Sequence, residues 1–548
     1  MTLAVQGKLV AQDPSDEPAS ELLKKIRAEK DRLIAAKALK REKDEPALTE
    51  DALPFALPVS WSWSALGEVI DIVRGITFPA TQKTREAAPG RIACLRTSNV
   101  QQTIEWEDLL FVDRSFMGRE DQLIQHHDIV MSMANSRELV GKVALIEHIP
   151  HAEATFGGFL GVLRPRKIDP RYAMAVLRTP YARSLLIDSS SQTTNIANVS
   201  LAKLRPLPFP LPPEAEQSRI VTRVEELMRL CDALEAKGQL EAAQHAQLVS
   251  TLLATLSERE TPAQLNENWH RIATHFDLLL DRPAAVDALE QTILQLAVRG
   301  LLVPQDPQDE PASELLKKIR AEKDKLIAEG KIKRGAPLPP ITEDEQPFVL
   351  PHGWEFVRLI DLMPEFQNGA SSRGDAGGQS TTVLRLADIK GRRISLADTR
   401  QIQIKVVDIK KYQLVEGDIL ITRVNGSADI VGQFNLCDQA FNAIYCDHFI
   451  RMRIDRRWIA PDFCALLGES ELIRASIKNL FTTTAGQKTV NQGHIGSLTF
   501  GLPPLAEQSR IVTRVAQLRR LCADLRQRLA ASQSTQAHLA EALVQNVV

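Results

Sequence analysis

The 548-residue sequence contains no apolar stretch close to the roughly 20 residues that a membrane-spanning helix needs. Its first residues lack a basic region followed by an apolar core, so we expect no signal peptide. The six cysteines are scattered without a Cys-x-x-Cys pair. This spacing excludes a disulfide framework and the common zinc patterns, and it predicts reduced thiols in the cytoplasm.

A basic excess is also absent. The chain has 67 Lys and Arg residues against 69 Asp and Glu residues, a formal net charge of −2. Domains that bind nucleic acid by themselves are usually strongly basic. A role on DNA would therefore depend on local basic surfaces or on a partner that supplies positive charge.

Catalytic and cofactor motifs are missing as well. There is no P-loop, no Gly-rich cofactor loop with a downstream acid, and no Asp/Asn-Pro-Pro-aromatic tetrapeptide of the amino-methyltransferase kind. Asp-Ile-Lys occurs at 388–390 and 408–410, but three residues do not identify a nuclease motif. The spacing of Cys437, Cys446 and His448 matches no common zinc site. We therefore predict no catalytic site and no metal site.

An internal duplication is the main feature that is present. The segment LAVQGKLVAQDPSDEPASELLKKIRAEK begins at Leu3 and returns, nearly unchanged, at Leu296. The segment LPPEAEQSRIVTRV begins at Leu211 and returns as LPPLAEQSRIVTRV at Leu502. Between these frames, residues 54–210 and 347–501 share only a faint skeleton, with Trp61 and Trp354 at matching places. This pattern indicates one scaffold that serves two different recognition tasks.

Periodic apolar residues predict helices in both frames. The arms are rich in Ala, Leu, Lys and Glu and carry a narrow apolar stripe. The segments after each LPP continue with apolar residues at alternating spacings of four and three, which is typical of a coiled coil. A helix of about 40 residues would span about 60 Å, so we expect a spacer. The predicted packing residues are Ile220, Val224, Leu227, Cys231, Leu234, Ile511, Val515, Leu518, Cys522 and Leu525.

Polar loops interrupt the two divergent inserts. Alternating runs such as Lys142–Ile146 and Gln401–Val406 predict strands, and short helices are expected at 170–187 and 461–479. These loops carry side chains of the types that contact phosphates and base edges, although polar loops are also common as solvated surface. The candidates in the first insert are Arg74, Thr77, Asn135, Arg137, Thr193, Thr194 and Asn195. Those in the second insert are Ser371, Ser372, Arg373, Arg423, Asn425, Gln487 and Lys488.

The paired LPPxAEQSRIVTRV helices and QDPxDEPASELLKKIRAEK arms resemble the specificity subunits of type I restriction–modification enzymes, over essentially the whole chain. The resemblance implies that each insert is a target-recognition domain for one half of a split double-stranded DNA site. It implies that the helices set the spacing and dock two methyltransferase subunits, which methylate adenine N6 with S-adenosylmethionine. Separate restriction–translocase subunits would use ATP and Mg. This chain itself would bind no cofactor.

The expected fold class is α+β: two α/β target-recognition domains separated by long paired, coiled-coil-like helices, in a tandem duplication with pseudo-two-fold symmetry. The expected boundaries are an N-terminal arm (1–53), a first recognition domain (54–211), a central helical region (212–346), a second recognition domain (347–502) and a C-terminal helix (503–548). Within the central region, residues 258–295 have no counterpart in the first half, and we expect them to be helical.

Two other classes of function stay open at this point. One is a coiled-coil interaction scaffold that does not bind DNA. The other is a self-contained methyltransferase or nuclease, which would need a cofactor or metal motif that the sequence does not contain.

Overall fold

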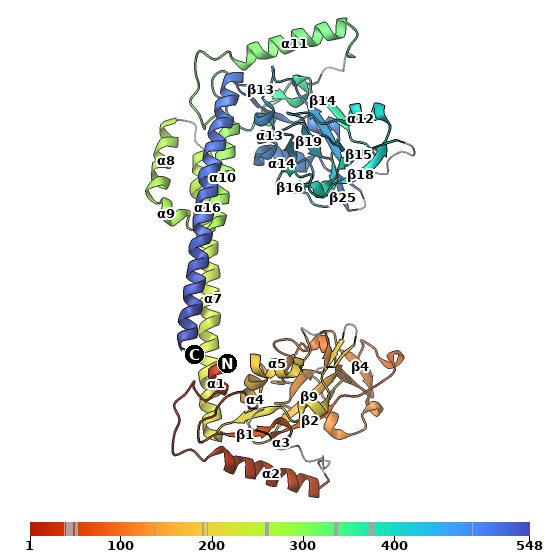
Figure 1. Cartoon of the computed structure of the whole chain (residues 1–548), viewed down its shortest axis with the longest axis vertical. Coiled ribbons are helices and arrows are strands. Elements are labelled where there is room, and N and C mark those ends of the chain that lie inside the picture. Colours follow the sequence, from red (N-terminus) through yellow and green to blue (C-terminus); the bar gives the residue numbers. More distant parts are fainter. Residues whose placement is uncertain are drawn as a thin grey trace. The chain divides into compact units, whose positions relative to one another are not determined.

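The computed structural model describes residues 1–37, 39, 48–49, 53–136, 139–188, 191–193, 196–257, 262–333, 338–371, 378–484 and 486–547. The chain forms two compact units, which we call unit 1 (Met1–Gly238) and unit 2 (Gln239–Val547) (Figure 1). Over the described ranges, no helix has the length and apolar character to cross a membrane.

Unit 1 begins with two helices and continues into a mixed domain. Its helices are α1 (Thr2–Val5), α2 (Ala19–Ala35), α3 (Leu66–Val69), α4 (Pro170–Leu177), α5 (Pro180–Asp188), α6 (Leu201–Leu204) and the start of α7 (Glu214–Ser257). Its strands are β1 (Ser62–Ala65), β2 (Ile70–Arg74), β3 (Arg91–Leu95), β4 (Leu110–Asp113), β5 (Ile129–Ser132), β6 (Ala134–Asn135), β7 (Val143–Leu145), β8 (Ala154–Phe156), β9 (Leu160–Pro165), β10 (Ser191–Thr193), β11 (Ile196–Asn198) and β12 (Pro208–Leu211).

Unit 2 holds the end of α7 and the remaining elements. Its helices are α8 (Pro262–Thr274), α9 (Phe276–Leu279), α10 (Pro283–Val298), α11 (Ala312–Ala328), α12 (Val406–Tyr412), α13 (Pro461–Glu469), α14 (Glu471–Asn479), α15 (Gln492–Gly496) and α16 (Leu505–Val547). Its strands are β13 (Glu355–Arg358), β14 (Glu365–Asn368), β15 (Gln379–Leu384), β16 (Ile389–Lys390), β17 (Arg393–Ile394), β18 (Arg400–Ile404), β19 (Ile419–Thr422), β20 (Val424–Asn425), β21 (Phe434–Leu436), β22 (Ile444–Tyr445), β23 (Phe449–Arg453), β24 (Thr482–Thr484), β25 (Gln487–Thr489) and β26 (Thr499–Leu502).

The two divergent inserts have the same strand topology. The central sheet of unit 1 has the order β2-β9-β5-β7, and that of unit 2 has the order β14-β23-β19-β21. Three smaller sheets also correspond: β4-β3-β8 to β18-β15-β22, β10-β11-β6 to β24-β25-β20, and β1-β12 to β13-β26. The central strands β5 and β19 are buried along their whole length, so each insert is built around an apolar core. The predicted pair of α/β domains with helices at 170–187 and 461–479 is confirmed.

Each arm is joined to its long helix through a buried carboxylate. In unit 1, Glu216 in the first turn of α7 accepts hydrogen bonds from Trp61 Nε1 (2.9 Å) and Gln12 Nε2 (2.6 Å). Arg219, one turn further on, pairs with Asp16 of the arm. The two matching tryptophans of the sequence are therefore explained, because each indole satisfies a glutamate that the domain, arm and helix bury together.

The same contacts recur in unit 2. There, Trp354 Nε1 and Gln305 Nε2 donate to Glu507 of α16, at 3.1 and 3.2 Å, and Arg510 pairs with Asp309. The arms pack into the cores of their units through the stripe that the sequence predicted, with Leu22 and Ile26 buried in α2 and Leu315 and Ile319 buried in α11.

The predicted packing stripe of α7 is only partly correct. Ile220 is buried, Val224 is half-buried against the core of unit 1, and Leu227 is half-buried. Cys231 is exposed, and Leu234 has 60% of its surface exposed. The expected burial of Cys231 and Leu234 is therefore wrong for this chain. Beyond Leu227 the helix has left the recognition domain, and none of the described elements of unit 1 covers this face.

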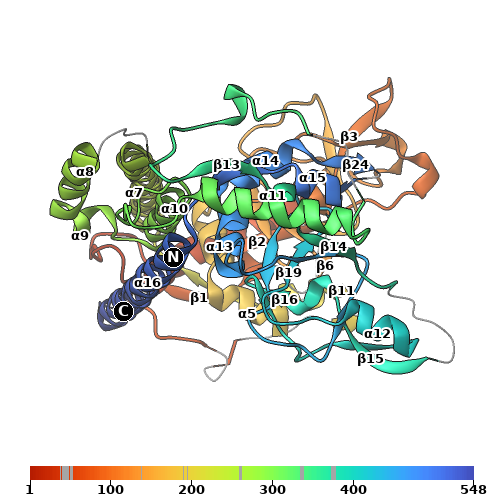
Figure 2. The same ribbon diagram turned by 90° about the horizontal axis from the view of Figure 1, so that it is seen from above.

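In α16 the equivalent stripe is covered, but by an element that the sequence analysis did not expect there. Ile511, Val515 and Cys522 are buried and Leu518 and Leu525 are half-buried, in a cluster with residues of α10 such as Leu289 and Ile293. Figures 1 and 2 show α10 beside α16, with α8 and α9 on the side remote from the sheets of unit 2. The connector at 258–295 is thus helical, as predicted, where it is described.

Charged residues explain why α10 fits α16. Arg519 pairs with Glu290 of α10 (3.0 Å), and Arg526 pairs with Asp287 and Glu290 (both 2.7 Å). The matching positions of α7 hold Met228 and Glu235, which cannot form these pairs. The two long helices therefore carry the same apolar stripe. Only α16 has the arginines that pair with α10.

Candidate nucleic-acid interface

Three chain segments meet where the central sheet of unit 1 ends. The segment after β2 joins the turn between β8 and β9, because Ile76 N donates to Phe156 O at 2.9 Å. The segment after β5 joins the same turn, because Met133 N donates to Phe159 O at 2.9 Å. Gly75 permits this approach, since a Cβ there would lie 2.2 Å from Gly157 O. The result is a rigid junction that carries exposed side chains.

Unit 2 repeats this junction with the same backbone hydrogen bonds. Ala370 N donates to Tyr445 O at 2.9 Å, and Arg423 N donates to His448 O at 2.7 Å. A Cβ at Gly369 would lie 2.0 Å from Cys446 O, which again requires glycine. The positions of the two junctions can therefore be matched one to one, independently of the low sequence similarity.

A small three-stranded sheet borders each junction. In unit 1, β6 pairs with β11, and Asn135 lies opposite Ala197. In unit 2, β20 pairs with β25, and Asn425 lies opposite Lys488. The Lys488 ammonium donates to Gly426 O at 3.1 Å. Strand β25 thus lies beside the segment that follows the central strand.

A buried ion pair holds the start of each central strand. Arg164 Nε lies 2.7 Å from Asp128 Oδ1, and Arg453 Nε lies 2.7 Å from Asp418 Oδ1. Neither aspartate has exposed surface, and the hydrogen bond to Asp418 raises the pKa of Arg453. These pairs fix the rigid strands from which the junctions project, which is how a recognition surface keeps its geometry.

The structure brings most of the described candidate residues to these junctions. Arg74 and Thr77 are exposed at the end of β2, Asn135 is in β6, and Thr193 is in β10. Ser371 is exposed after β14, Arg423 and Asn425 are half-buried at β20, and Gln487 and Lys488 are in β25. Five candidates lie outside the described residues: Arg137, Thr194, Asn195, Ser372 and Arg373.

Sequence reasoning missed several residues at the same junctions. Phe159 and His448 occupy the turns between β8 and β9 and between β22 and β23. Asn368 ends β14, at the position that Arg74 has in β2, and its Oδ1 accepts a hydrogen bond from Gln492 Nε2 at 3.1 Å. Matching TFGGFLGV at 155–162 with IYCDHFIR at 444–451 would have found Phe159 and His448, since both runs lead into a strand of the central sheet.

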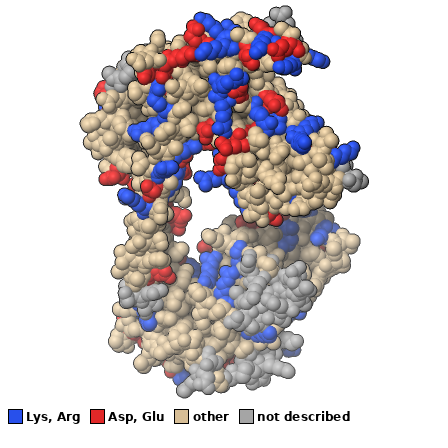
Figure 3. Space-filling view, turned by 45° about the horizontal axis from the view of Figure 1, so that its top comes forward, with Lys and Arg blue, Asp and Glu red and all other residues tan. Residues whose placement is uncertain are grey.

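Charges of both signs are mixed on the surface. Figure 3 shows Lys and Arg side chains interspersed with Asp and Glu on the face in view, in keeping with the formal net charge of −2. Phosphate binding grows with the number of uncompensated cations, so this chain is not suited to tight DNA binding by charge alone.

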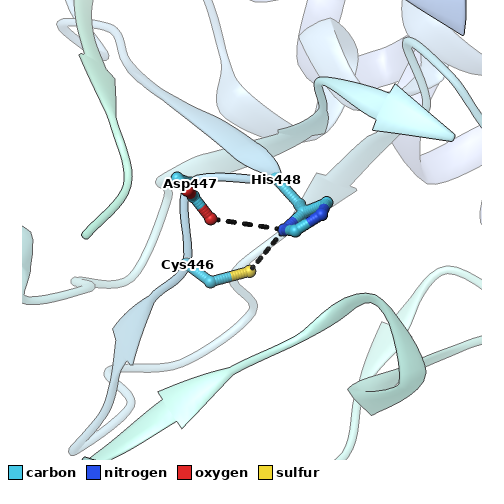
Figure 4. A group of neighbouring side chains, drawn as sticks. All are labelled: Cys446, Asp447 and His448. Atoms are coloured by element: carbon cyan, nitrogen blue, oxygen red, sulfur yellow. Dashed lines mark hydrogen bonds and ion pairs between the residues drawn. The ribbon is translucent and has the colours of Figure 1, made fainter. Parts of the chain in front are cut away.

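The turn that carries His448 also contains the one cluster of three potential metal ligands within the described ranges (Figure 4). His448 Nδ1 lies 3.3 Å from Asp447 Oδ1 and 3.7 Å from Cys446 Sγ. Burial raises the pKa of the Cys446 thiol to about 11, whereas a metal-binding cysteine must be a thiolate. Cys437 is not part of the cluster. The three consecutive side chains therefore fit a hydrogen-bonded turn better than a four-ligand metal site.

The Asp-Ile-Lys triplets do not form a carboxylate site either. Asp388 is buried and accepts hydrogen bonds from the backbone N–H (2.7 Å) and the guanidinium (3.0 Å) of Arg385. Asp408 lies in helix α12. Since Asp388 is satisfied by its neighbour and Asp408 is on another element, the triplets have structural explanations.

The chain is similar to several known proteins over nearly its whole length. Residues 58–244 match the family model described as Type I restriction modification DNA specificity domain. The chain is 33% identical to the Type I restriction enzyme EcoEI specificity subunit of Escherichia coli, over 99% of this chain and 92% of the relative. It is 34% identical to the Type I restriction enzyme EcoAI specificity subunit of Escherichia coli, with the same coverage. A solved structure from a study of assembly and conformational transition of the type I R-M system has a TM-score of 0.45 and 17% identity, covering 90% of this chain and 98% of that chain.

Proposed function

The chain belongs to the specificity subunits of type I restriction enzymes, and we propose that each of its units reads one half of a bipartite, asymmetric DNA site. The observation that carries this proposal is the repeated junction, which has the same backbone contacts in both units but different exposed side chains. One scaffold with two sets of side chains is what two unlike half-sites require.

Direct reading takes place at base edges in the major groove, where each base pair presents a distinct pattern of donors and acceptors. Arg74 and Lys488 are suited to phosphates and purine edges, and Asn135 and Asn425 to the bidentate contacts that amides make with adenine. These residues lie at matching or neighbouring positions of the two junctions. We assign them the recognition of the two half-sites.

We assign the chemistry to partner subunits. Two methyltransferase subunits would methylate adenine N6 with S-adenosylmethionine, and restriction–translocase subunits would use ATP and Mg. This chain would act as a non-catalytic subunit that directs them to the DNA site. Partners that close around the duplex would also supply the phosphate contacts that the near-neutral chain cannot make.

Exposed apolar side chains on the helices support docking of protein partners. Leu234 and Leu240 of α7 are about as exposed as Leu521 of α16, with 60%, 59% and 64% of their surfaces accessible. In unit 2, Trp269, Leu521 and Leu525 line an apolar groove between α8, α10 and α16. An exposed apolar groove of this kind is typical of protein interfaces. The helices and arms are the surfaces that we expect the methyltransferase subunits to bind.

A recognition-domain exchange tests the proposal. Residues 347–501 would be replaced by the second recognition domain of another family member, and the methylated sites of cells expressing the complex would be sequenced. One half-site should change and the other should stay the same. A change in both halves, or a single continuous palindrome, would contradict the two-reader model.

Two binding measurements separate the alternative functions. A gel shift with the chain and its methyltransferase subunits should show a specific DNA complex, whereas a coiled-coil scaffold without DNA binding would show none. Methyl transfer by the purified chain alone would instead indicate a self-contained enzyme.

A further inference from the structure

Two residues missed by the sequence analysis occupy one and the same position in the two junctions. The carbonyl of Phe159 accepts a hydrogen bond from Met133 N, and the carbonyl of His448 accepts one from Arg423 N. Residues 160 and 449, next in the chain, accept from the paired glycines Gly75 (3.3 Å) and Gly369 (3.2 Å). The backbone at 159 and 448 is therefore held identically, and only the side chains differ.

The surroundings of this position differ in chemistry. In unit 1, Phe159 is 69% exposed, and the residue hydrogen-bonded to it, Met133, is apolar and buried. In unit 2, the His448 side chain is 45% exposed, and the residue hydrogen-bonded to it, Arg423, is cationic. A single exposed phenylalanine is common on protein surfaces and is no signal by itself. Here it replaces a histidine at a matched point of a proposed DNA-reading surface.

Phe159 has no role in the core of unit 1 that would explain it. The adjacent strands bury Phe156 and Leu160 completely, with 0% and 1% of their surfaces exposed, while the ring of Phe159 between them stays outside. Gly158 packs against Thr77, since a Cβ at 158 would lie 3.3 Å from Thr77 Cγ2. The ring is thus carried on a tightly packed turn beside Thr77, one of the predicted DNA contacts.

We propose that position 159/448 determines the base read at the matching point of each half-site: Phe159 packs against the 5-methyl group of a thymine, and His448 hydrogen-bonds a base edge. The C5-methyl of thymine is the apolar feature that the standard bases present in the major groove, and phenylalanine is among the side chains that contact it. Because Nδ1 of His448 faces Asp447 and Cys446, its Nε2 is the ring nitrogen that would pair with a base-edge donor or acceptor. This inference rests on the proposed function.

Base analogues test it without disturbing the protein. The full-length chain would be assembled with its methyltransferase subunits, and the preferred site would be selected from random duplexes. Each thymine in the half-site read by unit 1 would then be replaced by deoxyuridine, which lacks only the methyl group. At one thymine the wild-type complex should bind about fourfold more weakly, the fold-change that corresponds to losing one buried methyl-sized group.

Three variants identify the side chain responsible. Phe159→Ala should bind thymine and deoxyuridine equally at that position and should leave the second half-site unchanged. His448→Ala is the matched control, because it should keep the deoxyuridine effect and relax selection only in the second half-site. Phe159→His covers the case in which the alanine variant does not fold, and it should also abolish the deoxyuridine effect.

The outcomes are distinguishable. If the wild-type complex selects no sequence at all, the proposed function fails. If it selects a bipartite site but the half-site of unit 1 contains no thymine, or deoxyuridine weakens wild type and Phe159→Ala equally, the proposed function stands and this inference is overturned. A ring that wedges between base steps, rather than packing on a methyl group, would leave wild-type binding unchanged by deoxyuridine at every thymine, which would also overturn this inference.

Discussion

Replacing Trp61 with Phe should destabilise unit 1 by leaving a buried carboxylate oxygen without its donor. Trp61 Nε1 donates to Glu216 Oε2 at 2.9 Å, and Glu216 has no exposed surface. Phenylalanine keeps most of the apolar volume of the 5%-exposed tryptophan but has no N–H group. The side chain of Gln12 satisfies the other oxygen, Oε1, and does not replace the lost donor.

The size of the effect follows from the charge on the acceptor. A hydrogen bond to a charged group contributes about 1.5–3 kcal/mol to stability, and a buried partner left unpaired costs a similar amount. For domains of about 150–250 residues, 1 kcal/mol shifts Tm by about 2–4 °C, so we expect a decrease of about 3–12 °C. Trp354→Phe should have the same effect on unit 2, because Trp354 donates to Glu507 in the same way.

Differential scanning calorimetry of the full chain measures this without relying on tryptophan fluorescence. Each single variant should lower the transition of its own unit, and the double variant should lower both. Trp63→Phe is the matched control, since the indole of Trp63 packs at a tilt against Phe55 with centroids 5.0 Å apart and makes no hydrogen bond among the described residues. If Trp61→Phe and Trp63→Phe shift Tm equally, or neither shifts it, the buried carboxylate does not hold the arm as argued.

Three further predictions concern the carboxylates, the thiols and the spacer. Burial raises the pKa of Glu216 and Glu507 above the usual 4.5, so the free energy of unfolding should fall as the pH rises from 4.5 through the raised pKa. Denaturant titrations at a series of pH values measure this. The double variant with Gln at both positions should lack this pH-dependent decrease. A thiol reagent should label exposed Cys231 rapidly and buried Cys522 slowly in the native protein, while equal native rates would contradict the packing of α10 on α16. Deleting one heptad from each long helix, about 10 Å of rise, should change the preferred spacer between half-sites and leave both half-sequences intact; a duplex series of varied spacer length checks this.

The sequence by itself was enough for the organisation of the chain. Comparison of the chain with itself identified the arms, the long helices and the two divergent inserts, because near-identical segments at matched distances require the same local structure. The short helices at 170–187 and 461–479 and the strand at Lys142–Ile146 also followed from apolar periodicity. Most of the described candidate residues lie where strands end, because polar residues cluster there, and their contact with DNA stays a prediction.

The same periodicity could not say what covers an apolar stripe. Ile511–Leu525 and Ile220–Leu234 have nearly the same pattern, yet one is packed by α10 and the other is exposed beyond Leu227. A heptad spacing shows that a helix has an apolar face, but the partner depends on charges such as Arg519 and Arg526, whose counterparts in α7 are Met228 and Glu235. The element that packs there lies more than 200 residues away in the chain.

What the sequence determined alone is therefore local: duplicated frames, helical and strand periodicity, and the absence of a catalytic motif. Only the tertiary structure decided which distant residues contact each other and which residues of the two units occupy matching positions. Phe159 and His448 became comparable because the backbone hydrogen bonds from Met133 and Arg423 place them at the same site of two matched junctions. Trp61 and Glu216 are 155 positions apart, and their hydrogen bond exists because the folded domain buries both against the arm. Contacts of this kind form between residues far apart in the sequence, so they depend on the tertiary fold and cannot be predicted from the spacing of residues along the chain.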